Sequence, residues 1–193
     1  NNRLSGTVPA YLFNMPSLDS LNLASNYFAG PLTVPFNMGG SMLSTLDVSY
    51  NVLSGDVPQL LLPRLGSFKV NNNLFTGFLS EIKMPLVSFL DISHNQFEFS
   101  LDELIRYPGL VSLLASNNLL YGDINAFKRL SSLRIADVSS NNITGTPIPQ
   151  DLLLMYSQDL QQLYIYNNPT MTPTSITSIT YGPWRTTQSQ PSP

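Results

Sequence analysis

The sequence predicts an α/β solenoid of about seven to eight short units stacked with their strands parallel. One phrase predicts the strands: alternating apolar residues and then an asparagine, as in Leu46-Asp47-Val48-Ser49-Tyr50-Asn51, recur along nearly the whole chain. The spacing predicts the stack, because the asparagines of successive copies lie 22 to 27 residues apart. Such a period is typical of solenoids, in which each unit buries its apolar side against its neighbours.

The recurring asparagine has a structural explanation. After each short strand the chain must bend, and the backbone groups at the bend lose their sheet partners. A buried amide side chain can both donate to and accept from such groups, so stacked asparagines would form a ladder along the solenoid. We assign this structural role to Asn26, Asn51, Asn73, Asn95, Asn118, Asn141 and Asn168.

The second half of each copy continues with another apolar pair, a glycine and a proline, as in Val52-Leu53-Ser54-Gly55-Asp56-Val57-Pro58. This pattern resembles the plant-type leucine-rich repeat, whose second half reads L-x-G-x-I-P. Such repeats occur in receptor-kinase ectodomains and polygalacturonase inhibitors. The resemblance covers roughly residues 1–168. It implies a right-handed leucine-rich-repeat superhelix with a concave parallel β-sheet and an irregular or short-helical convex side.

We divide the chain into three parts. Residues 1–168 form the leucine-rich-repeat solenoid, whose first repeat is partial; residues 169–184 form a degenerate C-terminal cap with a strand at 179–181; residues 185–193 form a flexible Thr/Ser/Pro tail. On the convex side we expect short helices at 9–14, 58–62, 101–107 and 149–156. Phe99 stands where other repeats have glycine, so the repeat should lose regularity near 97–101.

The N-terminal end has no comparable cap. We expect the strand at 18–23 to be an open sheet edge, with Leu18, Leu21 and Leu23 largely uncovered on its core side. Exposed edges and apolar patches recruit partners. The sequence therefore favours either further repeats before Asn1 or self-association at this end.

Composition excludes several classes of function. Charged residues make up 11% of the chain and its net charge is −3, whereas a nucleic-acid surface needs clustered cations, so no nucleic-acid partner is expected. No apolar run approaches the length of a membrane span. The segment contains no cysteine, which excludes disulfides and thiolate chemistry within it.

Three aspartates in one outward column of the predicted sheet raise the question of a metal site or a glycosidase. Asp47 and Asp91, like Asp91 and Asp137, are two strands apart, which is roughly 10 Å. That distance is too long for shared metal ligation, and Lys69 lies between the first two. His94, the only histidine, has no nucleophile arranged beside it for a triad. We expect no enzyme activity, no metal and no cofactor.

The outward columns of the concave strands are the expected ligand-binding surface. Aromatic rings beside Ser and Asn suit peptide or glycan contacts, because they offer apolar area with a polar group. The candidate residues are Tyr50, Lys69, Phe89, Asp91, His94, Tyr164 and Tyr166. Among them, Phe89, Tyr164 and Tyr166 should be exposed. Shielding of the C-terminal end of the solenoid is an equally good explanation for the last two.

The segment Asn142-Ile143-Thr144 is the sole usable N-glycosylation sequon, and Asn142 should point to solvent. With the low charge and the resemblance, it favours an extracellular or cell-surface location. The sequence thus predicts a non-catalytic recognition or adhesion module that binds a protein, peptide or glycan on its concave face. The alternative is a structural subunit of an extracellular filament, wall or sheath, assembled through its repeat ends.

Overall fold

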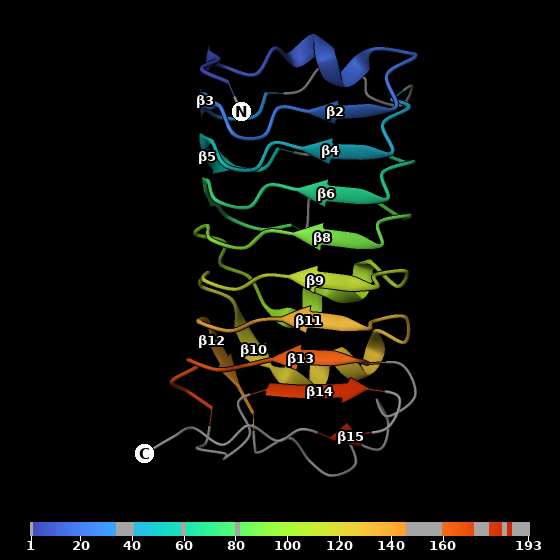
Figure 1. Cartoon of the computed structure of the whole chain (residues 1–193), viewed down its shortest axis with the longest axis vertical. Coiled ribbons are helices and arrows are strands. Elements are labelled where there is room, and N and C mark those ends of the chain that lie inside the picture. Colours follow the sequence, from blue (N-terminus) through green and yellow to red (C-terminus); the bar gives the residue numbers. More distant parts are fainter. Residues whose placement is uncertain are drawn as a thin grey trace.

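The computed structural model describes residues 2–33, 41–58, 61–79, 82–145 and 160–171, and the backbone of 178–182 and 185–186. The chain winds into a column whose strands lie one above another along its long axis (Figure 1). Strands line two sides of this column. We call the two sets the long sheet and the flank sheet.

The long sheet has nine strands in the order β15-β14-β13-β11-β9-β8-β6-β4-β2. Their bounds are β2 Ser20–Asn22, β4 Thr45–Asp47, β6 Ser67–Lys69, β8 Phe89–Asp91, β9 Ser112–Leu114, β11 Ile135–Asp137, β13 Gln162–Tyr164, β14 Ser178–Gly182 and β15 Arg185–Thr186. The strands from β2 to β13 pair in parallel. The strand that the sequence places at 179–181 is part of β14, which runs antiparallel to β13.

Each parallel strand of the long sheet is three residues long and points its middle side chain into the core. These middle residues are in register along the column: Leu21, Leu46, Phe68, Leu90, Leu113, Ala136 and Leu163. All are buried. Removing apolar surface from water stabilises by about 25 cal/mol per Å². A strand too short to be stable alone is therefore held by the neighbours above and below it.

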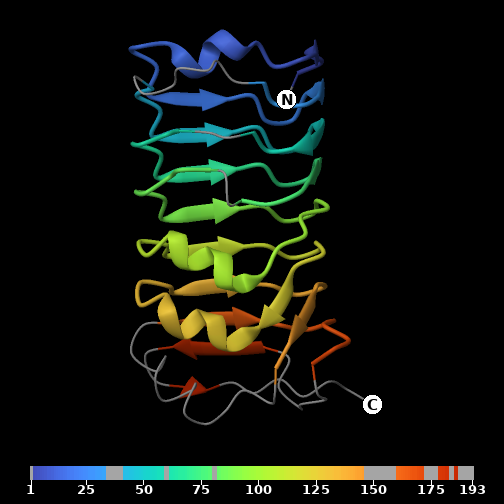
Figure 2. The ribbon, with the colours of Figure 1, turned by 180° about the vertical axis from the view of Figure 1, so that it is seen from behind.

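The flank sheet consists of two groups of short parallel strands on one side of the column (Figures 1 and 2). The first group is β1 Ser5–Gly6, β3 Tyr27–Gly30, β5 Val52–Asp56 and β7 Leu74–Thr76; the second is β10 Tyr121–Asp123 and β12 Asn142–Thr144. The break between them falls where Phe99 replaces glycine. Phe97 and Phe99 are both fully buried there, with ring centroids 6.3 Å apart. The expected loss of regularity near 97–101 is confirmed.

The ladder asparagines join consecutive repeats. The Asn51 Oδ1 accepts from the Phe28 N–H of the preceding repeat at 3.0 Å. Its Nδ2 donates to the Leu23 carbonyl of that repeat and to the Val48 carbonyl of its own, both at 3.0 Å. The pattern recurs at Asn73, Asn95, Asn118, Asn141 and Asn168. Asn26 accepts from the Leu4 N–H and donates within its own repeat.

The residue before each ladder asparagine has a left-handed backbone. Its φ lies between 52° and 58° at Ser25, Tyr50, Asn72, His94, Asn117, Ser140 and Asn167. Asparagine and histidine are enriched in this region of φ/ψ space, whereas a bulky residue such as tyrosine adopts it rarely. Every repeat therefore turns its corner in the same way, whatever side chain it carries there.

Among the described residues, the convex side carries three short 3-10 helices: η1 Ala10–Asn14, η2 Leu101–Arg106 and η3 Ile124–Arg129. The helices expected at 9–14 and 101–107 are confirmed. The helix expected at 58–62 is wrong as far as this segment is described, because Leu61 pairs with Lys83 in a parallel bridge. The one expected at 149–156 lies outside the described residues. η3 was not expected, although Asp123 caps it by accepting from the Asn125 N–H at 2.7 Å.

A buried tyrosine ties two repeats together on the convex side. The Tyr107 hydroxyl lies 3.0 Å from the Leu79 carbonyl and 3.2 Å from the Ile82 carbonyl of the preceding repeat, so its proton can be donated to either. Burial raises the pKa of Tyr107 to about 12. The hydroxyl therefore keeps its proton, and its link to the preceding repeat, well above neutral pH.

The N-terminal end is better covered than the sequence predicts. Within the part of the chain that the structure describes, β2 is the last strand of the long sheet, as expected. The expectation of an uncovered core side is wrong, because Leu21 is buried and both Leu18 and Leu23 are partly buried against the core. η1 lies across this end of the column (Figure 1), and its Phe13 is fully buried. Phe13 is the cap residue that sequence reasoning missed.

Removing one ladder amide tests how strongly the repeats depend on it. Asn118→Ala leaves the buried Phe97 N–H without its acceptor, whereas the Ile92 carbonyl keeps the bond from the Asn95 amide. A buried backbone group left unpaired costs about 1–3 kcal/mol, so we expect a loss of roughly 1–3 kcal/mol in urea unfolding. Asn142→Ala, an exposed asparagine, is the matched control in unglycosylated protein and should change stability by less than about 0.5 kcal/mol. Equal losses in the two variants would contradict the ladder.

Candidate functional site

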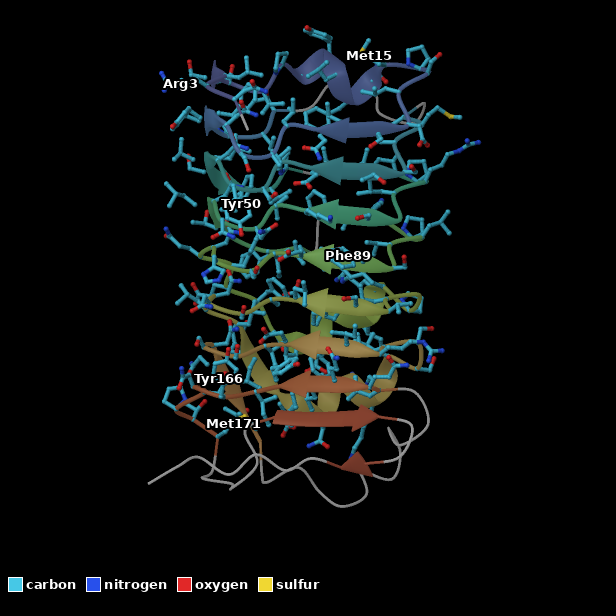
Figure 3. The ribbon with its side chains drawn as sticks, in the orientation of Figure 1. Arg3, Met15, Tyr50, Phe89, Tyr166 and Met171 are labelled. Carbon is cyan, nitrogen blue, oxygen red and sulfur yellow. The ribbon has the colours of Figure 1, made fainter. Side chains whose placement is uncertain are left out.

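Figure 3 looks onto the outward side of the long sheet, which we call the long-sheet face, with Phe89 near its middle. Because the strands are in register, each position of the strand forms a row along the column. One row contains Asn22, Asp47, Lys69, Asp91, Leu114, Asp137 and Tyr164, and the row beside it contains Ser20, Thr45, Ser67, Phe89, Ser112, Ile135 and Gln162. The face thus changes from mostly polar over β2–β6 to partly apolar over β8–β13.

The three aspartates of this face are engaged locally. The Oδ1 atoms of Asp47, Asp91 and Asp137 each accept from the hydroxyl and the backbone N–H of the serine two residues later. The hydroxyl contacts are 2.6–2.7 Å long. Among the described residues, no group of three or more acidic or histidine side chains is placed to hold a metal. Each carboxylate thus serves first to fix the end of its own strand.

Burial changes the pKa of the Asp91 carboxyl group. Partial removal from water raises the pKa of Asp91, and the charge of Asp47 adds to the rise. The hydroxyl and N–H of Ser93 and the ammonium of Lys69 act in the opposite direction but do not cancel it. The carboxylate is therefore charged at some cost, which a cation brought by a ligand would reduce.

Three of the candidate residues come together on β6 and β8. The Lys69 ammonium lies over the Phe89 ring, 5.3 Å from its centroid, and Asp91 is on the same strand face as Phe89. A cation at this distance is attracted by the ring. The expectation that Phe89 is exposed is corrected, because its ring is half-buried beneath Lys69. The result is a compact group with one cation, one anion and one aromatic ring.

Sequence reasoning did not single out the apolar residues beside this group. Leu114 is the register partner of Asp91, and Ile135 lies two strands from Phe89 in the same row. Both are half-buried and face outward. The sequence could have identified them, because each stands at a strand position that is polar in most other repeats. With Phe89 they give the middle of the face an apolar surface.

Tyr164 and Tyr166 lie at the C-terminal part of the face. Tyr164 is half-buried, which corrects the expectation of an exposed ring, whereas Tyr166 is 43% exposed. In the row that contains Leu114, Asp137 stands between Leu114 and Tyr164. Tyr164 is therefore a separate aromatic side chain on the face, carried by the strand that pairs with β14.

Tyr50 and His94 do not join this group. Both are exposed corner residues with left-handed backbones, at φ 52° and 53°. Figure 3 shows Tyr50 between the long sheet and the flank sheet and away from Phe89. The candidate residues therefore separate into a central group on the long sheet and two outlying side chains at its edge.

Asn142 lies neither in the central group on the long sheet nor at the edge of that sheet. It begins β12 in the flank sheet, and its side chain is exposed. The Thr144 hydroxyl of the same sequon donates to the Gly122 carbonyl at 3.1 Å. A glycan on Asn142 would therefore project from the flank side and leave the long-sheet face open.

Comparison with known proteins agrees with this geometry, although no protein-family model matches the chain. The chain is 29% identical over 157 residues to receptor-like protein 18 of Arabidopsis thaliana. The aligned segment covers 81% of this chain and 16% of that relative. It is similar to the ectodomain of the plant receptor kinase GASSHO1/SCHENGEN3 from Arabidopsis thaliana, with a TM-score of 0.69 and 28% identity, over 86% of this chain and 20% of that one. It is also similar to the ectodomain of the Arabidopsis receptor kinase HAESA, with a TM-score of 0.67 and 25% identity; this match covers 86% of this chain and 28% of that one.

The chain is a leucine-rich-repeat solenoid, and its relatives are plant receptor-like proteins and receptor ectodomains. It spans 16% of the length of receptor-like protein 18, so it matches one stretch of a much longer relative. In the described residues of the solenoid, no helix is long and apolar enough to cross a membrane.

Two substitutions at Asp91 of the solenoid separate its structural role from its charge. Asp91→Ala removes the acceptor for two groups of Ser93 and should cost about 1–2 kcal/mol in urea unfolding. Asp91→Asn keeps an acceptor and removes the charge, so stability at neutral pH should be unchanged or slightly higher.

The pH dependence of the same pair has a defined sign. Because burial raises the pKa of Asp91 in the folded chain, the contribution of this carboxyl group to stability increases as pH falls through that pKa. Any advantage of Asp91→Asn should therefore shrink on acidification. An advantage that grows as pH falls would contradict this account.

Proposed function

We propose that this chain is part of an extracellular, non-catalytic recognition module whose long-sheet face binds a polypeptide ligand. The observation that carries the proposal is the group formed by Lys69, Phe89 and Asp91 beside outward-facing Leu114 and Ile135. Binding surfaces combine an apolar centre with a few polar groups that fix orientation. This part of the face has both.

The in-register rows suit an extended ligand. A peptide that lies along the column meets a new side chain at every strand, at a spacing of about 4.8 Å. Apolar ligand side chains would pack on Phe89, Leu114 and Ile135, and a basic group would pair with Asp91. Tyr164 would extend the contact, and Tyr166, Tyr50 and His94 would contribute from the edge.

The relatives support a role in recognition over a structural or an enzymatic role. The solved ectodomain of HAESA is in complex with a peptide hormone ligand. The curated relative is a receptor-like protein, which supports the proposed cell-surface location. A protein or glycan ligand would use the same face. We propose no catalytic role, because the aspartates of the face are each bonded to a serine.

The alternative, a structural subunit joined through its repeat ends, has less support. An uncovered core would favour such contacts at the N-terminal end, but Phe13 and Leu21 are buried there.

Peptide selection tests the proposed site. A displayed library of random linear peptides is selected on the immobilised chain, and the recovered peptides are measured against variants. We expect Phe89→Ala and Tyr164→Ala to weaken binding about tenfold or more, as truncation of aromatic anchors does. Tyr11→Ala, at an exposed tyrosine on η1, is the matched control and should change binding by less than about twofold. Peptides that bind both face variants unchanged would contradict the proposed site.

Glycosylation tests the proposed location independently. We expect protein from its native source to carry an N-linked glycan on Asn142, which is exposed in a sequon. Glycopeptide analysis should show a mass shift at this residue that N-glycosidase removes, and Asn142→Gln should abolish it. Unmodified Asn142 in natively produced protein would count against an extracellular module.

A further inference from the structure

The sequon asparagine stands beside two exposed apolar side chains. Asn142 begins β12, and its register partner on β10 is Tyr121. Tyr121 is 42% exposed, and Leu119, two residues before it, is 54% exposed. Figures 1 and 2 show β10 and β12 side by side on the flank side of the column. We call Leu119 and Tyr121 the flank pair.

The backbone pairing directs Asn142 and Tyr121 to the same side. β10 and β12 pair in parallel over three residues, with Gly122 opposite Ile143 in the middle. Ile143 is fully buried, so the middle positions face the core and the end positions face solvent. The Asn142 N–H donates to the Leu120 carbonyl at 2.8 Å, which fixes Asn142 against the segment that carries the flank pair. Side chains stand roughly perpendicular to a sheet, so those of Asn142 and Tyr121 run outward together from backbones about 4.8 Å apart.

The polar residues beside Tyr121 are engaged elsewhere. Ser100 is its partner on the other side, through an isolated parallel bridge, and the Ser100 hydroxyl accepts from the Asp102 N–H at 3.3 Å as the cap of η2. Asp123 is the next outward residue of β10, and its Oδ1 accepts from both the N–H and the side-chain amide of Asn125. Both polar neighbours therefore bond within their own repeat and leave the flank pair exposed.

We propose that the first sugar of an N-linked glycan on Asn142 packs against the flank pair and so forms part of the folded structure. The inference rests on the proposed secretory location, because a chain acquires such a glycan there. It goes further than the location, which requires only that the glycan is attached. The occupant of this apolar surface is thus a group that the chain itself carries.

The attachment is a substitution at the first sugar. The Asn142 Nδ2 attacks C1 of the N-acetylglucosamine of a lipid-linked oligosaccharide pyrophosphate. The bond between Nδ2 and C1 forms as the bond between C1 and the pyrophosphate oxygen breaks. The Nδ2 loses one proton, and the lipid pyrophosphate leaves with the bonding electron pair. The Thr144 hydroxyl completes the acceptor sequence.

An N-acetylglucosamine ring fits the chemistry of the flank pair. One face of the β-linked sugar presents axial C–H groups with partial positive charge, whereas the face of an aromatic ring is partially negative. Stacked rings have centroids about 4.5–7 Å apart, and the two strands lie about 4.8 Å apart. The sugar ring begins at the end of the Asn142 side chain and therefore lies at stacking distance from Tyr121. Its acetyl methyl group and Leu119 provide further apolar contact.

The N-terminal part of the flank sheet offers a matched tyrosine without this neighbour. Tyr27 begins β3 and is 59% exposed, and its register partner is Ser5, which cannot carry an N-linked glycan. The two tyrosines therefore share a sheet and an exposed setting but differ in their distance from Asn142. The long-sheet face lies on a different side of the column, so the packed sugar leaves the proposed ligand site open (Figure 1).

Thermal unfolding of two forms of the full chain tests the proposal. One form is secreted from a eukaryotic host and trimmed by an endoglycosidase to a single N-acetylglucosamine on Asn142. The other has the same sequence and is made unmodified in a bacterial host. We expect the single sugar to raise the midpoint temperature by about 2–4 °C, as one stacked-ring contact would in a chain of this length. An unchanged midpoint would overturn the proposal.

Substitution of the tyrosine assigns this rise to the contact. Tyr121→Ala should reduce the rise to less than about 1 °C, whereas Tyr121→Phe keeps the ring and should retain more than about half of it. Tyr27→Ala is the matched control and should leave the rise unchanged within about 1 °C. Comparing the two forms of each variant removes the effect of the substitution on the unmodified chain. A rise that survives Tyr121→Ala would overturn the packing.

Nuclear magnetic resonance tests the contact directly. In the form with one labelled sugar, nuclear Overhauser effects should connect the Tyr121 ring protons to C–H protons of the sugar, and the ring current should move the latter to higher field. Tyr121→Ala should abolish both effects. A modified Asn142 without these signals would overturn the packing and leave the proposed location standing. An Asn142 that the secretory host leaves unmodified would overturn the packing and also count against the location.

Discussion

The asparagine ladder is the interaction on which the rest of the structure depends. Each parallel strand of the long sheet has three residues, which gives too few backbone hydrogen bonds to hold a repeat by itself. The Asn51 amide, and its equivalents, bond to the bend of their own repeat and to backbone groups of the one before. The amides therefore satisfy groups that the sheets leave unpaired and set the register between repeats. The buried apolar rows and the outward rows both follow from that register.

The same regularity explains where a binding surface can arise. The ladder and the corner conformation fix the backbone of every repeat alike, so outward side chains are free to vary without changing the fold. On most strands these positions carry small polar residues, and the aspartates close hydrogen bonds with nearby serines. Phe89, Leu114 and Ile135 depart from this pattern on consecutive strands. Departures that the fold does not require are the best guide to function in such a protein.

Periodicity made much of this fold predictable. The spacing of asparagines identified the solenoid, and alternation along the strands identified the core positions that are buried. The substitution of glycine by Phe99 located the break in the flank sheet. Each of these features repeats, or interrupts a repeat, so a single sequence contains several examples of it.

Features that occur once were harder to predict. Phe13 covers the end of the column through a short helix without a repeated counterpart, and the antiparallel direction of β14 depends on a chain reversal that no pattern marks. In the candidate site, Lys69 covers Phe89 from the neighbouring strand, and this contact depends on side-chain conformations that spacing does not specify. η3 could have been found, since Asp123 precedes it as a cap and Lys128 and Arg129 close it.

The reach of each amide into the preceding repeat also bears on how such a chain can change its length in evolution. In the preceding repeat, the partners of the Asn118 amide are backbone groups and not side chains, and the Asn141 amide bonds to the equivalent groups one repeat further along. A gene duplication or deletion of one whole repeat would therefore join two compatible surfaces and preserve the bonding. Its effect would fall on the order of outward side chains, which would shift by one strand. Recombination between repeats could thus alter specificity in single steps while the scaffold remains intact.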